Sequence, residues 1–124
     1  MARILVVDDE EDMRSMLTQM LERVGHTVVT ANNGEEAIEA FAAHTPDLML
    51  IDILMPKKGG LVAISEIRKQ SPEAPILAMS GGGRDGKLNF LSTAQTFPGV
   101  RTVRKPFRRQ QLLALVGEML EAAT

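Results

Sequence analysis

The sequence predicts an α/β protein in which a parallel five-stranded sheet carries helices on both faces. Short β-branched or apolar runs alternate along the chain with longer segments whose apolar residues recur at helical spacing. One run, residues 48–51, is continuously apolar, as is typical of a strand buried on both faces. Such alternation implies parallel strands that are joined by right-handed crossovers.

Each of the five expected strands is followed by a helix. Gly25 lies where the first helix should stop, Asn33 can cap the second, and Pro46 ends that segment. The expected strands are residues 3–7, 27–31, 48–51, 75–79 and 100–103. The expected helices cover 13–24, the segment after Asn33, the segment from about residue 61, about 85–96, and about 108 to the C-terminus. Residues 55–60 are expected to form a loop.

Length and composition indicate one domain over residues 1–124, with 44% hydrophobic and 24% charged residues. The chain has no cysteine, which excludes disulfides and thiolate metal sites. A leader is not expected after Met1, and no apolar run approaches the ~20 residues that span a bilayer. We therefore expect a cytoplasmic protein without membrane insertion, and the positions of the two ends favour a stand-alone form over a fragment.

Charge is unevenly distributed. Residues 1–52 hold eleven acidic and three basic residues, whereas residues 84–109 hold seven basic residues and one acidic residue. This asymmetry either steers charged partners or forms a solvated face, and both interpretations remain open.

Polar side chains follow four of the five expected strands. Asp8 and Asp9 follow the first, Asp52 ends the third, Ser80 follows the fourth and Lys105 the fifth. In open α/β sheets, ligands bind beyond the carboxyl ends of the strands. These five residues therefore define one candidate site.

Each of these residues also has an ordinary structural interpretation when it is taken alone. Asp8 or Asp9 could cap a helix, Asp52 could cap a loop, Ser80 could belong to a turn and Lys105 could be solvated. Three carboxylates at one edge repel each other, however, unless cations compensate them. Lys105 supplies one positive charge, and Mg²⁺, which prefers oxygen ligands, would supply two.

This arrangement suggests phosphoryl transfer. Carboxylates act as nucleophiles that form aspartyl phosphates, and Asp52 is the best candidate because it ends the central strand. Lys105 and the Ser80 hydroxyl can contact phosphoryl oxygens. The glycines at 81–83 would let backbone N–H groups approach a phosphate.

Four motifs resemble the receiver domain of two-component response regulators over essentially the whole chain. They are residues 4–10 (ILVVDDE), residues 52–56 (DILMP) with Gly60, residues 79–81 (MSG) and residues 105–107 (KPF). The resemblance implies a flavodoxin-like (βα)₅ fold with strand order 2-1-3-4-5, similar to a chemotaxis-type single-domain receiver.

The resemblance implies a role for each matching residue. Asp9 would bind Mg²⁺ directly and Asp8 mostly through water. Asp52 would be both a ligand and the phosphoacceptor, and the backbone carbonyl of Leu54 would complete the set. Lys105 would contact the phosphoryl group, with its bond to Pro106 often cis, and Ser80 would be the switch hydroxyl.

The sequence departs from the family pattern at the second switch position. The residue three before Lys105 is usually aromatic, but here it is Thr102, so no ring can move inward at this position. The residues before the fifth strand, Pro98 and Gly99, also depart from the usual Gly-Ala. The triple glycine at 81–83 lengthens the following loop, which we predict to be mobile without phosphate.

The resemblance also implies partners. A sensor histidine kinase or a histidine phosphotransfer protein would supply the phosphoryl group. A downstream protein would bind the face formed by the fourth helix, the fifth strand and the fifth helix, and direct nucleic-acid binding is not expected. That face carries basic residues, which suit an acidic partner or simply solvate the face: Lys87, Arg101, Arg104 and Arg108.

Two other classes of function compete with this switch, which would assist only its own phosphorylation and dephosphorylation. A phosphatase with an aspartate nucleophile usually needs a second acid two residues later, where this chain has Leu54. A flavin carrier usually stacks aromatic rings on its cofactor, and this chain has no Tyr or Trp. A receiver that binds partners without phosphorylation is disfavoured because the acids and the lysine are all present.

Overall fold

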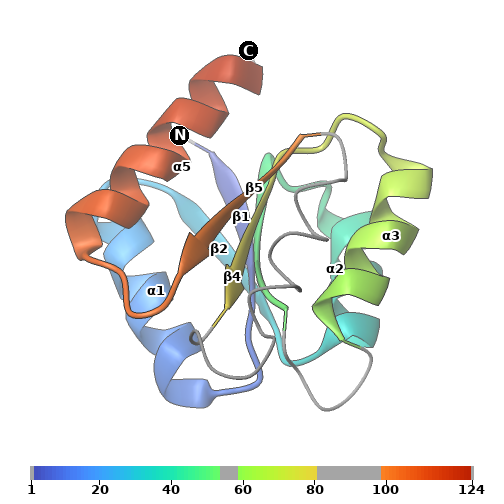
Figure 1. The fold of residues 1–124 in the computed structure, drawn as a ribbon, viewed down its shortest axis with the longest axis horizontal. Coiled ribbons are helices and arrows are strands. Elements are labelled where there is room, and N and C mark those ends of the chain that lie inside the picture. Colours follow the sequence, from blue (N-terminus) through green and yellow to red (C-terminus); the bar gives the residue numbers. More distant parts are fainter. Residues whose placement is uncertain (1, 54–58, 81–98, 124) are drawn as a thin grey trace.

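The computed structural model describes residues 2–53, 59–80 and 99–123 (Figure 1). Within them, five parallel strands form one sheet in the order β2-β1-β3-β4-β5, which confirms the predicted order. The strands are β1 (Arg3–Val7), β2 (Thr27–Ala31), β3 (Leu48–Asp52), β4 (Ile76–Ser80) and β5 (Val100–Arg104). The described helices are α1 (Glu11–Arg23), α2 (Gly34–His44), α3 (Gly60–Gln70) and α5 (Arg109–Ala123).

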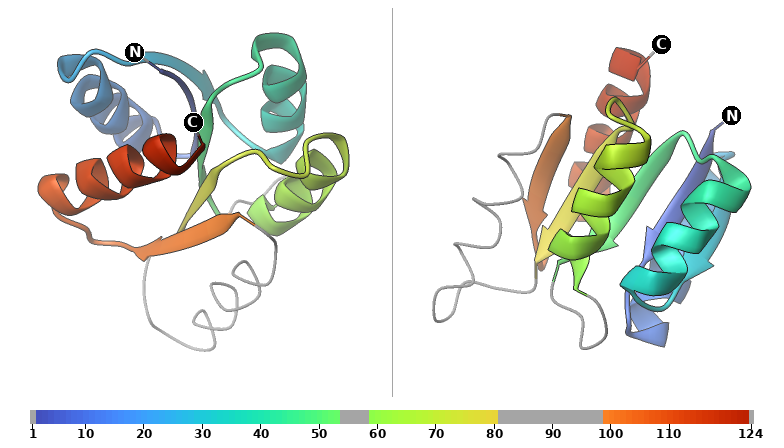
Figure 2. Two further views of the ribbon diagram at one scale, coloured as in Figure 1. Left: turned by 90° about the horizontal axis from the view of Figure 1, so that it is seen from above. Right: turned by 90° about the vertical axis from the view of Figure 1, so that its right-hand side faces the viewer.

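Helices cover both faces of the sheet, as predicted (Figure 2). Successive strand residues point to opposite faces, so Ile4 and Val6 pack under α1 and α5, whereas Leu5 and Val7 face α2 and α3. The helix expected over residues 85–96 and the glycine loop at 81–83 lie outside the described residues.

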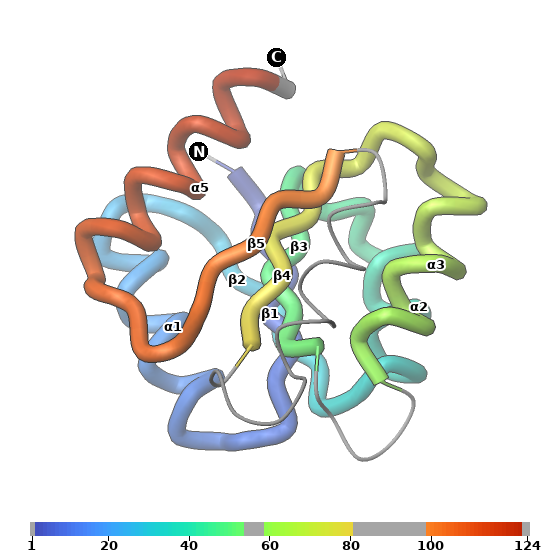
Figure 3. The backbone as a smooth tube through the Cα atoms, in the orientation of Figure 1, coloured from blue at the N-terminus to red at the C-terminus, as the bar shows by residue number. Residues whose placement is uncertain are grey.

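The central strand β3 is buried along its whole length. It pairs with β1 on one side and with β4 on the other, and Figure 3 follows the chain through these neighbours. This burial confirms the interpretation of the apolar run at 48–51, and it places the end of β3 in the middle of the sheet edge.

Helix α2 begins at the predicted cap. The Asn33 side chain accepts a hydrogen bond of 2.9 Å from the Glu36 N–H, and the Glu36 carboxylate accepts one of 2.8 Å from the Asn32 N–H. This reciprocal pair satisfies two backbone donors at the helix start. Helix α1 differs, since its cap residue is Glu10, which makes no side-chain cap hydrogen bond. Neither Asp8 nor Asp9 is therefore the cap residue.

Several boundaries differ from the expected ones by one or two residues. Helix α1 begins at Glu11, two residues before the expected start, because the acidic Glu11 and Asp12 suit the first turn of a helix. Helix α3 begins at Gly60, which the sequence placed in the preceding loop. The strands β3, β4 and β5 extend one residue further because the pairs Asp52–Met79 and Ser80–Arg104 prolong the ladder. In the segments that the structure describes, no helix is both long and apolar enough to cross a membrane.

Candidate functional site

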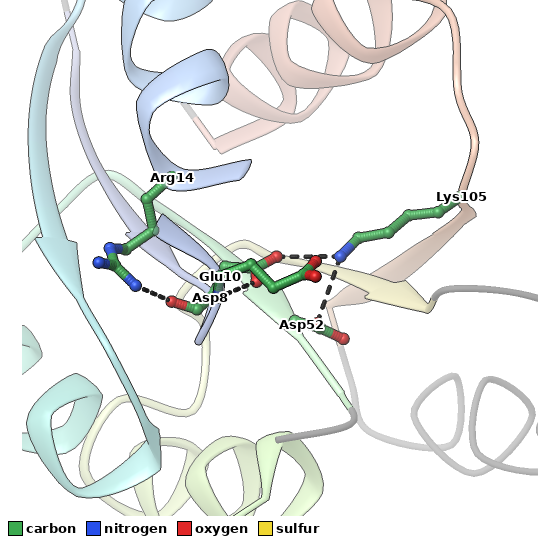
Figure 4. Close-up of polar contacts among 5 residues, drawn as sticks. All are labelled: Asp8, Glu10, Arg14, Asp52 and Lys105. Atoms are coloured by element: carbon green, nitrogen blue, oxygen red, sulfur yellow. Dashed lines mark hydrogen bonds and ion pairs between the residues drawn. The ribbon is translucent and has the colours of Figure 1, made fainter. Parts of the chain in front are cut away.

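The ends of three strands bring Asp8, Asp52 and Lys105 into direct contact (Figure 4). Lys105 Nζ donates to Asp8 Oδ2 at 2.9 Å and to Asp52 Oδ2 at 3.2 Å. Asp8 follows β1, Asp52 ends β3 and Lys105 follows β5. The parallel sheet therefore assembles residues far apart in sequence at its carboxyl edge, as predicted from the strand ends.

Three carboxylates gather at this edge. One oxygen from each of Asp8, Asp9 and Asp52 lies within 4.8 Å of the others. Asp8 and Asp52 are buried, whereas Asp9 is exposed. An all-oxygen set that is partly open to solvent fits a hard divalent cation, which keeps several water ligands. Leu54, whose carbonyl was expected to complete this set, lies outside the described residues.

The Lys105 ammonium is held in its charged form. Burial alone would lower the pKa of Lys105, but the hydrogen bond to Asp8 and the charges of Asp52 and Asp8 outweigh it, so the pKa is raised. Its side chain is 11% exposed. Lys105 therefore stays positive at neutral pH and compensates part of the acidic charge.

Asp8 is fixed by contacts that sequence reasoning did not foresee. Its Oδ1 accepts from the Glu10 N–H at 2.9 Å, and its backbone carbonyl accepts from Arg14 Nη1 at 2.8 Å. Its N–H donates to the Ala31 carbonyl at 3.2 Å. Side chains on a helix lean towards its N-terminus, so a basic residue in the first turns of α1 can reach back to the end of β1. The position of Arg14 in the sequence was therefore the signal from which this contact could have been predicted.

Ser80 lies at the end of β4 and is fully buried. Its carbonyl accepts from the Lys105 N–H at 2.7 Å, which ties the start of the Lys105–Pro106 segment to β4. The Lys105–Pro106 peptide bond is cis, as the resemblance implied. No described atom hydrogen-bonds to Ser80 Oγ, and a buried hydroxyl without a partner calls for an explanation.

A family model described as "Response regulator receiver domain" matches residues 4–117. The chain belongs to this family. Receiver domains of two-component response regulators are signalling switches that interact with histidine kinases and downstream effectors, and they bind Mg²⁺ at an acidic pocket. The membership favours the switch over the phosphatase and the flavin carrier.

Individual relatives agree with this membership. The chain is 33% identical to the chemotaxis protein CheY of Halobacterium salinarum over 97% of its own length and 98% of that protein. It is 38% identical to the autoinducer 1 sensor kinase/phosphatase LuxN of Vibrio campbellii over 72% of its length, but it spans only 10% of LuxN.

A solved structure is similar over nearly the full chain. The response regulator TrrA from Thermotoga maritima, solved in complex with Mg²⁺–BeF, superposes with a TM-score of 0.84 at 34% identity. The match covers 96% of this chain and 99% of that one.

The receiver domain carries Thr102 on the same face of the sheet as Ser80. Thr102 pairs with Ala78 and Ser80 with Arg104, so the two hydroxyl residues occupy diagonal positions on one face. Thr102 is half-buried. A short side chain thus occupies the position diagonal to the buried serine, where the family pattern usually has a ring.

The basic face expected on the output side is only partly described. Arg101 Nη1 pairs with Glu118 Oε1 on α5 at 3.0 Å, so part of its charge is compensated within the domain. Arg104 and Arg108 are exposed, and Lys87 lies outside the described residues.

Proposed function

We propose that this receiver domain accepts a phosphoryl group on Asp52 in a Mg²⁺-dependent reaction. The observation that carries the proposal is the convergence of three carboxylates within 4.8 Å around the ammonium of Lys105. One lysine leaves about two negative charges uncompensated in this cluster, which a divalent cation would balance. Asp52 ends the central strand, with β1 and its Asp8 on one side and β4 and its Ser80 on the other.

Asp52 is the nucleophile in this proposal. One of its carboxylate oxygens forms a bond to phosphorus while the N–P bond of a phosphohistidine breaks, and the imidazole of the donor keeps the electron pair and takes up a proton. Asp8, Asp9, Asp52 and the Leu54 carbonyl would hold the metal. A bound Mg²⁺ would neutralise charge on the phosphoryl oxygens. The TrrA structure in complex with Mg²⁺–BeF supports this assignment by similarity.

Lys105 and Ser80 bind the transferred group. Lys105 already contacts Asp52, so its ammonium is placed to pair with a phosphoryl oxygen on that side chain. The Ser80 hydroxyl is a buried donor that no described acceptor uses, and a phosphoryl oxygen would give it a partner. The domain assists only its own phosphorylation and dephosphorylation, and it is not a turnover enzyme.

The phosphoryl group comes from a sensor histidine kinase or a histidine phosphotransfer protein in the cytoplasm. Signal output passes to a downstream protein, not to nucleic acid, through the face of the fourth helix, β5 and α5. Ser80 and Thr102 share the sheet face that would report the change, with Thr102 in place of a ring. The whole chain, residues 1–124, acts as one receiver domain.

The direct test is the intact mass of the protein after incubation with a small acyl phosphate and Mg²⁺. We expect the wild type to gain one phosphoryl group and Asp52→Asn to gain none. Asp47→Asn is a matched control, since Asp47 precedes the same strand at its opposite end and accepts a 2.8 Å bond from the Arg3 N–H that asparagine can also accept. A folded wild type that gains no mass with any donor would refute the proposal.

A further inference from the structure

Arg14 contacts the acidic edge from outside the set of residues assigned above. It lies in the first turns of α1, and its Nη1 donates to the backbone carbonyl of Asp8 at 2.8 Å (Figure 4). Its own backbone N–H donates to the Glu10 carbonyl at 3.0 Å, at the start of the helix. Arg14 therefore ties the first turn of α1 to the end of β1, across the bend that carries Asp8 and Asp9.

The contacts of Asp8 fall into two groups by the role of the partner. The bonds with Ala31 and Arg14 hold the backbone of Asp8, and the Glu10 N–H holds its Oδ1. None of these three partner groups takes part in the proposed chemistry. The bond from Lys105 joins two side chains that both belong to the phosphorylation site. When Lys105 moves towards a phosphoryl group, Asp8 depends on the remaining contacts for its position.

We infer that Arg14 is a positioning residue that fixes the backbone of Asp8 and thereby sets the Mg²⁺ affinity of the site. The inference rests on the proposed function for the identity of the ion. Arg14 touches neither metal nor phosphoryl group in this assignment, and it acts through Asp8. Groups that orient metal ligands commonly change metal affinity when they are replaced.

Loss of the Arg14 charge and loss of its hydrogen bond should change the Mg²⁺ affinity in opposite directions. A guanidinium near the site repels a divalent cation, so removing it would tighten Mg²⁺ binding if charge were its only contribution. Removing the bond to Asp8 loosens the ligand and weakens Mg²⁺ binding. The sign of the change in affinity therefore distinguishes the two roles.

The test compares Mg²⁺ binding by isothermal titration calorimetry in the wild type and in three variants. Arg14→Met removes the charge and the bond, and Arg14→Lys keeps the charge with a single-point donor in place of the planar fork. Arg23→Met is the matched control, because Arg23 is an exposed residue in the last turn of the same helix. Calorimetry suits this chain, which has no Trp or Tyr to report binding by fluorescence.

We expect the dissociation constant for Mg²⁺ to rise about tenfold in Arg14→Met and by less in Arg14→Lys, with Arg23→Met unchanged. An unchanged or tighter dissociation constant in Arg14→Met would overturn the inference. If Arg14→Met does not fold, Arg14→Lys decides, because it keeps the charge, and a weaker affinity in it can come only from the altered contact.

A metal-free measurement separates this inference from the proposed function. The Glu10 amide donates to Asp8 Oδ1, so its hydrogen exchange reports how firmly Asp8 is held. We expect faster exchange of the Glu10 amide in Arg14→Met than in the wild type, with core amides of β3 unchanged. Equal exchange rates would refute the positioning role even if phosphorylation is demonstrated. A wild type that accepts no phosphoryl group would refute the proposed function and leave this readout valid.

Discussion

At the scale of single residues, burial and ion pairing act on Lys105 in opposite directions. Burial of an ammonium is costly, and the structure offsets that cost with two carboxylates at 2.9 and 3.2 Å. Those carboxylates in turn need the ammonium, because like charges so close together destabilise the folded chain. The cluster is thus mutually dependent, and a change at one member alters the environment of the others.

Ser80 provides a prediction at the same scale. Its hydroxyl is buried without a hydrogen-bond partner among the described residues, and such a group costs about 1–3 kcal/mol. We expect Ser80→Ala to raise the free energy of unfolding of the unphosphorylated protein by about 1 kcal/mol, towards the low end of that cost because the lost Oγ leaves a small void. Urea unfolding measures the change.

The same substitution should slow phosphorylation while it stabilises the fold, because the proposed donor to the phosphoryl group is lost. A variant that is less stable than the wild type would show instead that the Ser80 hydroxyl already has a partner. Opposite effects on stability and on phosphoryl uptake would indicate that the cost of burying the hydroxyl is retained for function.

At the scale of elements, the start of α3 is pressed against the end of β3. The Gly60 N–H donates to the Ile53 carbonyl at 2.9 Å, and a Cβ at position 60 would lie 2.5 Å from the Asp52 carbonyl oxygen and 2.6 Å from Ile53 Cα. No side chain fits at those distances. Gly60 therefore lets α3 support the backbone that carries the proposed phosphoacceptor.

Two glycine substitutions test this packing with opposite expected signs. Gly60→Ala should lower the free energy of unfolding by about 1–3 kcal/mol, as overpacking of a close contact does. Gly117→Ala, in the interior of α5 with nothing within 4 Å of the added carbon, should raise it by about 0.5–1 kcal/mol. Urea unfolding of both variants provides the check, and a harmless Gly60→Ala would contradict the close approach.

The sequence predicted the positions of helices and strands better than the tertiary contacts between them. Alternating strand and helix periods located each described element within about two residues, and strand ends located Asp8, Asp52, Ser80 and Lys105. Gly60 was misplaced because its helical role depends on the approach of α3 to β3, which no local pattern encodes. The hydrogen bond from Arg14 to Asp8 was not predicted for the same reason, since it depends on how α1 lies over the end of β1.

At the scale of the whole molecule, the strand order concentrates charge at one point. Because β1 and β3 are neighbours in the order β2-β1-β3-β4-β5, the acids that follow them meet at one edge, in the crevice where ligands of such sheets bind. The fold thus carries a local electrostatic cost that a bound cation would remove. Mg²⁺ binding and global stability should therefore be linked.

Mg²⁺ should stabilise the whole domain. The stability of Asp9→Asn relative to the wild type should therefore depend on whether Mg²⁺ is present. An ion that binds only the folded state adds about 2.7 kcal/mol at a hundredfold excess over its dissociation constant. Asp9 is exposed, so its replacement removes a ligand and some repulsion at little cost in packing. Without metal, Asp9→Asn should be at least as stable as the wild type, whereas at saturating Mg²⁺ the wild type should be the more stable.

Thermal unfolding at constant ionic strength, with and without Mg²⁺, measures both stabilities, and Asp47→Asn should retain the wild-type response. If Mg²⁺ stabilises Asp9→Asn as much as the wild type, the ion binds elsewhere and the assignment of Asp9 as a ligand is wrong.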